Sequence, residues 1–210
     1  MRFAHLVGRL PVIVLGAMCA GAAYGGAVTV NVVSSNGVSA EDTVVVFDQL
    51  DAVAPPARAT ATIDQVDKEF VPKVNVIRTG TSVVFSNSDR VRHQVYSFSA
   101  AKTFTLKLYA GSPETPILFD KPGLVVLGCN IHDNMLGFVG IVDTPYFAKS
   151  PSSGSSSFNL PTGRYRLRVW HPRLAVAMPP KEIAVTTAPL TIPVELDLTA
   201  SAPGLSPWPE

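Results

Sequence analysis

The chain has 210 residues, a formal net charge of +1 and 47% hydrophobic residues. This length suffices for one large or two small domains. The balanced charge excludes a basic nucleic-acid-binding surface, so we expect no nucleic acid as a partner. The 18 prolines and 15 glycines favour many short strands and turns over long helices, and we predict an all-β fold.

Residues 1–25 have the pattern of a secretory signal peptide. Arg2 and Arg9 precede the apolar stretch "LPVIVLGAMCAGAA", and the small residues Ala23 and Gly25 follow it. This apolar stretch is too short for a stable membrane span. We expect cleavage near Gly25, export to the periplasm and no membrane span afterwards; a retained N-terminal anchor is the alternative.

Cleavage would also remove Cys19 and leave Cys129 as the lone cysteine. An intrachain disulfide is then excluded, so the Cys129 thiol is buried, reactive or bound to a metal. Lipidation at Cys19 is a further alternative, although the preceding "GAM" fits poorly before a lipidated cysteine.

The next elements are predicted strands. Residues 27–50 contain two β-branched runs around "SSNGVSAED", which predicts a hairpin, and the linker "DAVAPPARATAT" follows. Residues 63–144 contain several alternating or apolar runs, such as "TFTLKLYAG" and "MLGFVGIVDTPYF", separated by turns. The stretch "AKSPSSGSSSF", residues 148–158, predicts a flexible joint.

The C-terminal part begins with a strictly alternating segment, "FNLPTGRYRLRVWHP". Such alternation predicts a half-buried strand with Tyr165, Leu167 and Val169 on one face and Arg164, Arg166 and Arg168 on the other. We expect the arginine face to be solvated, with partner docking as the alternative. "KEIAVTTAPLTIPVELDL" predicts two more strands, and residues 199–210 are predicted to be disordered.

The chemistry concentrates in "GCNIHDNMLGFVGI", where Cys129, His132 and Met135 recur at intervals of three. A spacing of three residues within a loop allows successive ligands to surround one ion. His93 lies 36 residues upstream in "SNSDRVRHQV". Zinc rarely uses methionine, whereas two imidazoles, one thiolate and a weak thioether form the ligand set of a blue-copper site. We predict one copper ion, alternating between Cu(I) and Cu(II), with these four residues as ligands.

Each residue also has a simpler interpretation. Cys129 alone fits a buried core cysteine, and His93 alone fits a surface loop histidine. A nucleophilic pair of Cys129 and His132 lacks an evident orienting acid or oxyanion motif, so we expect no enzyme. His171 and Met178 fit packing or capping roles better than metal ligation.

The segment "ILFDKPGLVVLGCNIHDNMLGFVGIV" resembles the C-terminal copper-binding hairpin of cupredoxins, and its Cys-x₂-His-x₂-Met-x-Gly spacing is similar to that of amicyanin. "VFSNSDRVRHQV" resembles the strand and loop that carry the first histidine. The stretches "DKEFVPKV", "HQVYSFS" and "LGCNIHD" resemble cupredoxin-containing methylamine utilisation proteins. The resemblance implies a Greek-key cupredoxin sandwich over residues 60–146. Gln94 follows His93 where many cupredoxins have Asn, and Asn87 is a candidate for that loop-tying role.

The flanks resemble a different family. "VTVNVVSSNGVSAEDTVVVFD" and "FNLPTGRYRLRVWHP" are similar to strands of carboxypeptidase-regulatory or transthyretin-like sandwiches. The resemblance implies a smaller, discontinuous accessory sandwich built from residues 27–52 and 150–198, with the cupredoxin inserted between its second and third strands. Insertion is physically easy where the ends of the inserted domain lie close together.

Together, the ligand set and the resemblance predict a periplasmic protein that carries single electrons between unidentified periplasmic redox proteins. The resemblance implies that His132 is the ligand nearest solvent, and Ile131, Leu136 and Pro145 are candidates for an apolar docking rim. We expect a monomer. The alternatives are copper storage or delivery, for which few further methionines and histidines are present, and a non-redox envelope binding module with a structural copper site.

Overall fold

The computed structural model describes residues 25–113, 115–198 and 208–209. These residues form sixteen strands and no helix, so the predicted all-β class is confirmed. Accordingly, the described part of the chain offers no helix that could cross a bilayer. The predicted signal peptide lies outside the described residues except for Gly25, which begins the first strand.

Two sheets formed from the middle of the chain share one hydrophobic core, and we call this unit the central sandwich. The first sheet has the order β4-β3-β6-β9 and consists of β3 (Thr60–Val66), β4 (Glu69–Val71), β6 (Thr81–Phe85) and β9 (Ile117–Phe119). The second has the order β5-β11-β10-β7-β8 and consists of β5 (Val74–Arg78), β7 (Tyr96–Ser99), β8 (Lys102–Thr105), β10 (Gly123–Gly128) and β11 (Leu136–Val142).

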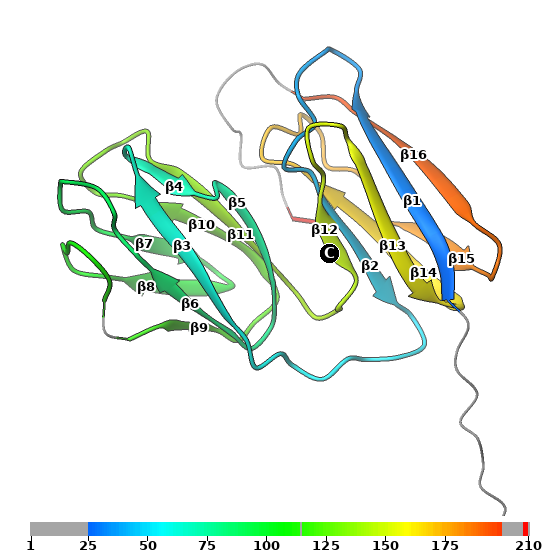
Figure 1. The fold of residues 1–210 in the computed structure, drawn as a ribbon, viewed down its shortest axis with the longest axis horizontal. Coiled ribbons are helices and arrows are strands. Elements are labelled where there is room, and N and C mark those ends of the chain that lie inside the picture. Colours follow the sequence, from blue (N-terminus) through cyan, green and yellow to red (C-terminus); the bar gives the residue numbers. More distant parts are fainter. Residues whose placement is uncertain (1–24, 114, 199–207, 210) are drawn as a thin grey trace, which may run out of the picture.

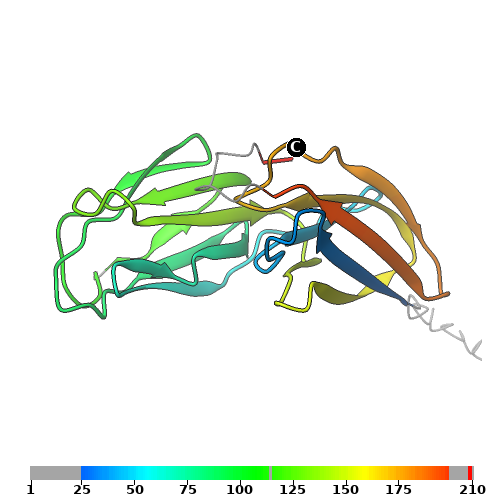
Figure 2. The same ribbon diagram turned by 90° about the horizontal axis from the view of Figure 1, so that it is seen from above.

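Two further sheets share a second core and form the flanking sandwich. One has the order β13-β1-β16 and consists of β1 (Gly25–Ser34), β13 (Ser155–Pro161) and β16 (Leu190–Leu196). The other has the order β12-β2-β14-β15 and consists of β2 (Val44–Gln49), β12 (Phe147–Lys149), β14 (Gly163–Trp170) and β15 (Lys181–Val185). The central sandwich therefore interrupts the flanking one between β2 and β12, and the two lie side by side (Figures 1 and 2).

The alternation in β14 has the predicted effect on burial. Tyr165, Leu167 and Val169 are buried in the core of the flanking sandwich, whereas Arg164 and Arg166 are exposed. Successive strand residues point to opposite faces of a sheet, so this sequence can bury only one set of them in that core.

A third cluster of buried side chains joins the two sandwiches, and we call it the junction core. It consists of Val44, Val46, Val74, Phe138, Val142 and Trp170. These residues come from β2 and β14 on one side and from β5 and β11 on the other. The centroids of the Phe138 and Trp170 rings lie 5.6 Å apart. Four sheets are thus stacked around three cores.

The predicted flexible joint at residues 148–158 is largely strand. Ser155, Ser156 and Ser157 belong to β13 and pair with β1, and Ser156 is buried. Backbone pairing with β1 supplies hydrogen bonds that do not depend on side-chain type, which explains why a serine-rich segment forms a strand here. The residues of β12 lie between the two domain ranges predicted from the sequence and pair with β2.

Residues 199–207 and 210 of the predicted disordered tail lie outside the described residues, but Trp208 and Pro209 occupy defined places. The Trp208 ring lies 5.6 Å from the Trp170 ring, and the Arg168 guanidinium lies 5.8 Å from the Trp208 centroid. Arg168 donates hydrogen bonds to both carboxylate oxygens of Asp48, at 2.5 and 3.0 Å, and to the Pro209 carbonyl oxygen at 2.8 Å. Arg168 is therefore a paired residue at the junction rather than part of a solvated face.

Removing a junction side chain should destabilise the protein. Trp170 is only 1% exposed, so Trp170→Ala is expected to lower the free energy of unfolding by about 3–5 kcal/mol. Urea denaturation of both proteins measures the difference. Phe98→Ala removes an aromatic ring that is 77% exposed and serves as the control with little expected effect. Equal losses for the two variants would contradict the importance of the junction core.

Stability should also depend on the protonation of His171. Its Nε2–H donates to the Glu41 carbonyl oxygen, and its Nδ1 accepts a bond from the Arg173 backbone N–H, each at 3.0 Å. Burial is the main cause that holds the pKa of His171 below its ordinary value of 6.5. As pH falls below about 6.5, the unfolded state binds the proton more readily than the folded state, and stability declines until pH lies below the folded pKa. Urea unfolding between about pH 8 and pH 5 should show a larger loss for the native protein than for His171→Gln; parallel curves would contradict this.

Candidate metal centre

The hairpin of β10 and β11 carries three of the four predicted ligands on its connection. Gly128 pairs with Leu136 at the end of the ladder, and Cys129 to Met135 join the strands. The backbone N–H of Met135 donates to the His132 carbonyl oxygen at 2.9 Å and closes a turn within this connection. Cys129 and Met135 are buried, and His132 is partly exposed.

His93 comes from the connection between β6 and β7, and backbone hydrogen bonds fix its position. His93 and Tyr109 exchange N–H to carbonyl bonds of 3.1 and 3.0 Å, and Asn87 and Gly111 exchange bonds of 2.7 and 3.2 Å. These two bridges hold the loop in place although it lies outside the named strands. The His93 side chain is fully buried.

The structure brings three of the predicted ligands together. Cys129 Sγ lies 3.7 Å from His93 Nδ1 and 3.9 Å from His132 Nδ1, and the three donor atoms lie within 4.8 Å of one another. The centroids of the two imidazole rings are 5.0 Å apart. Met135 is 2% exposed and belongs to the same buried cluster as Cys129. The thiol and both imidazoles therefore converge from two separate loops.

This donor set fits a bound cation. For metal–ligand bonds of about 2.0–2.3 Å and angles of about 120°, the separation between a sulfur and a nitrogen donor is about 3.8 Å. The observed separations of 3.7 and 3.9 Å match this value. A neutral His93 that donates from Nε2 has no proton on Nδ1, so its lone pair faces the sulfur. A positive ion between the three atoms would satisfy these donors.

Asp89 is the partner of His93 on the side of the ring away from Cys129. His93 Nε2 lies 2.6 Å from Asp89 Oδ2, and the Asp89 side chain is 12% exposed. Desolvation by burial alone would raise the pKa of Asp89, but hydrogen bonds from the Lys68 backbone, His93 and the Asp67 backbone outweigh it and hold that pKa below its ordinary value. The carboxylate is therefore ionised at neutral pH and accepts the Nε2–H of His93.

Asn87 organises the loop that carries His93. It is 5% exposed, and its Nδ2 donates to the carbonyl oxygens of Val91 and Tyr109 at 3.0 and 2.9 Å. Its Oδ1 accepts a bond of 3.0 Å from the Asp89 backbone N–H. These bonds connect the His93 loop with the segment around Tyr109; they tie this loop to a neighbouring segment, whereas the role suggested from the sequence was to tie the two ligand loops to each other.

Tyr109, which is partly buried, contributes a second anchor beside the cluster. Its hydroxyl donates to the Phe85 carbonyl oxygen at 2.8 Å and accepts a bond of 2.5 Å from Gln65 Nε2. Burial is the main cause that raises the pKa of Tyr109 to about 12. The phenol stays neutral in the physiological range, so these bonds persist there.

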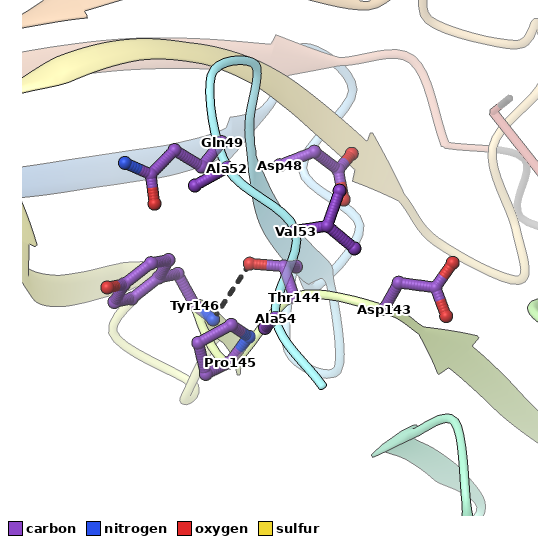
Figure 3. A pocket seen from close by; sticks show the side chains of 9 residues that line it. All are labelled: Asp48, Gln49, Ala52, Val53, Ala54, Asp143, Thr144, Pro145 and Tyr146. Atoms are coloured by element: carbon purple, nitrogen blue, oxygen red, sulfur yellow. Dashed lines mark hydrogen bonds between the residues drawn. The ribbon is translucent and has the colours of Figure 1, made fainter. Parts of the chain in front are cut away.

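Other candidates from the sequence lie elsewhere. His171 has both ring nitrogens bonded within the flanking sandwich, and Met178 packs against the core of that sandwich. Pro145 lies beyond the end of β11, so its predicted place in a docking rim is wrong. It lines a cavity of about 410 Å³ beside the linker, together with Val53 and Tyr146 (Figure 3).

The sequence interpretation missed Asp89 as a partner of the cluster. The available signal was its position four residues before His93 in the Asn- and Asp-containing loop "SNSDRVRH". Asn and Asp side chains commonly bond to the backbone of their own loops, which offers a simpler reason for their presence and hides such a role. Periodicity does not reveal a contact made through loop geometry.

No family model and no curated protein sequence matches this chain. Among solved structures, 40% of the chain is similar to 23% of a copper-containing nitrite reductase from Thermus scotoductus SA-01, with 28% identity and a TM-score of 0.38. The matched part thus spans less than a quarter of that reductase. Similarity also covers 39% of the chain and 98% of a purple cupredoxin from Nitrosopumilus maritimus, with 22% identity and a TM-score of 0.34. An oxidised amicyanin variant matches over 38% of this chain and 79% of its own, with 14% identity and a TM-score of 0.35.

The loop that carries His93 should depend on Asn87. Asn87→Ala removes three hydrogen bonds of a buried side chain and is expected to lower the free energy of unfolding by about 2–4 kcal/mol. Chemical denaturation measures the loss, and amide hydrogen exchange around Val91 and Tyr109 should accelerate. Asn75→Ala is the control because Asn75 Nδ2 makes one exposed bond, to the Pro72 carbonyl oxygen. Unchanged exchange in the Asn87 variant would contradict the loop-tying role.

Proposed function

We propose that the chain is a cupredoxin-type copper protein that carries single electrons between redox partners. The convergence of His93 Nδ1, His132 Nδ1 and Cys129 Sγ is the observation that carries this proposal. Two imidazoles and one thiolate with a weak thioether suit blue-copper electron transfer. We also propose that the protein is not an enzyme, because a ligand set of two imidazoles, one thiolate and a weak thioether is typical of electron-transfer sites.

The four residues have distinct roles in this proposal. Copper, when bound, would supply the one-electron couple between Cu(I) and Cu(II). Cys129 would contribute the strong thiolate bond, and His93 and His132 would complete a set of three strong donors. Met135 is buried beside Cys129 and is the candidate for the weak fourth ligand.

The surrounding structure favours fast transfer by keeping these donors in place. The backbone bridge to Tyr109 fixes His93, and the ladder of β10 and β11 fixes the ends of the Cys129–Met135 connection. Burial of His93, Cys129 and Met135 keeps water away from the donors. Donors that stay in one geometry need little rearrangement when the charge of the ion changes.

Electrons would enter and leave near His132. This residue is partly exposed, whereas His93 is fully buried, so His132 is the imidazole nearest to solvent. Ile131 and Val91, on the two loops that carry the donors, are 50% and 44% exposed and offer an apolar contact surface. Leu136, which begins β11, is partly exposed. Encounters between redox proteins are usually small and short-lived, which suits a surface of a few residues.

The cellular setting is part of the proposal. The signal-peptide pattern of residues 1–25 supports export to the periplasm, and the partners would then be periplasmic redox proteins. We propose a monomer that functions without a membrane span once the signal is cleaved. The resemblance to methylamine utilisation proteins suggests amine oxidation as the source of electrons.

Copper storage or delivery is less well supported. A storage protein needs several exchangeable sulfur and imidazole ligands, but within the described residues both nitrogens of His171 are bonded and Met178 is packed against a core. A binding module with structural copper is the remaining alternative. The flanking sandwich would then recognise the partner.

Copper reconstitution tests the proposed function. One equivalent of Cu(II) added to the mature protein should give an intense visible thiolate-to-copper band and a narrow EPR hyperfine splitting. Cys129→Ser should abolish both, because serine supplies no thiolate. His171→Gln removes a histidine outside the cluster and should leave both signals unchanged. Ordinary tetragonal Cu(II) signals that do not depend on Cys129 would contradict the proposal.

A further inference from the structure

A two-residue turn between β3 and β4 is shaped to hold a carboxylate. Val66 pairs with Glu69, and the intervening Asp67 and Lys68 have φ values of 52° and 63°. Positive φ at both positions suits a tight hairpin turn but is costly for residues other than glycine. The two backbone N–H groups converge on Asp89, at 2.7 Å from Oδ1 and 2.9 Å from Oδ2.

Asp89 connects this turn to the metal centre through its hydrogen bonds. Its Oδ2 lies 2.6 Å from His93 Nε2, and its own backbone N–H donates to Asn87 Oδ1 at 3.0 Å. The carboxylate is thus fixed by two backbone donors and one imidazole. Successive backbone N–H groups of this kind form a concave site for an anion.

We infer that Asp89, held by the Asp67–Lys68 turn, is a positioning residue that orients His93 and makes the copper centre favour Cu(II) over Cu(I). This inference rests on the copper function proposed above. Asp89 touches neither the ion nor a partner in this account, and it acts only through the ring of His93.

The effect follows from which nitrogen faces the cluster. Nδ1 of His93 faces Cys129, so the ring proton lies on Nε2 and is donated to Asp89. A carboxylate acceptor fixes the tautomer and the ring orientation and raises the basicity of the ligand nitrogen. A more basic donor stabilises the more highly charged ion, and the full burial of His93 with only 12% exposure of the Asp89 side chain limits the screening of this interaction by water. The expected consequence is a lowered reduction potential.

A purely structural role for Asp89 makes a different prediction. In that case the carboxylate ties the β3–β4 turn to the His93 loop, and its loss weakens the fold or the copper occupancy. The reduction potential of the molecules that still hold copper would then be unchanged. A measurement of potential separates the two roles, whereas a measurement of stability alone does not.

Asp89→Asn in the copper-loaded full protein tests the inference by voltammetry. We expect the preference for Cu(II) over Cu(I) to fall about tenfold, which equals a rise of ~59 mV in the potential of a one-electron couple. Asp133→Asn is the matched control, because it removes one negative charge from an exposed residue beside His132 in the sequence. The control should shift the potential much less.

The outcomes distinguish this inference from the proposed function. A native protein without the thiolate-to-copper band overturns the proposed function, and the inference with it. A native protein that shows the band, with equal potentials in the Asp89→Asn and Asp133→Asn variants, overturns the inference alone. If Asp89→Asn does not fold, NMR of the reduced native protein decides instead. A downfield His93 Nε2–H resonance that exchanges slowly supports the inference, and one that exchanges freely with solvent overturns it.

Discussion

Burial of β11 on both of its faces is the constraint on which the rest of the structure depends. Val139 and Ile141 enter the core of the central sandwich, while Phe138 and Val142 enter the junction core. A strand without a solvent face cannot slip by one residue without moving apolar side chains between two cores, so its register is strongly specified. β11 begins directly after Met135, and this fixed register therefore sets where the ligand connection ends.

The polar part of the site follows from the burial of an imidazole. A fully buried ring N–H without an acceptor costs several kcal/mol, on the order of the lost hydration of a polar group. Asp89 supplies the acceptor for His93, but its carboxylate then needs donors of its own. The strained turn at Asp67 and Lys68 provides them. The energetic cost of the strained turn is thus linked to the ordering of His93, a residue that the turn itself does not touch.

The sequence predicted the all-β class and the four candidate ligands from local patterns, because period-two alternation and ligand spacing are local properties. Three of those candidates, His93, Cys129 and His132, converge in the structure. The sequence did not predict the strand at Ser155–Ser157, because backbone pairing with β1 decides that segment. It also missed the packing of Trp208 against Trp170, although an aromatic residue in a polar, proline-rich tail was the available signal. Contacts between distant segments leave no periodic pattern in either one.

The position of the insertion explains how two sandwiches coexist without disturbing the ligand loops. The chain enters the central sandwich at β3 and leaves it after β11, and the backbone of Thr79 bonds to both Ala57 and Val142, so entry and exit lie close together. The ligand connection lies at the other end of β11, about 20 Å away for a strand of this length. The flanking sandwich therefore contacts the sheet that carries the ligand connection through the junction core, which includes Val74 of β5 and Phe138 and Val142 of β11. The two sandwiches meet along the face of a sheet, and Val91 and Ile131, on the loops that carry His93 and His132, are 44% and 50% exposed.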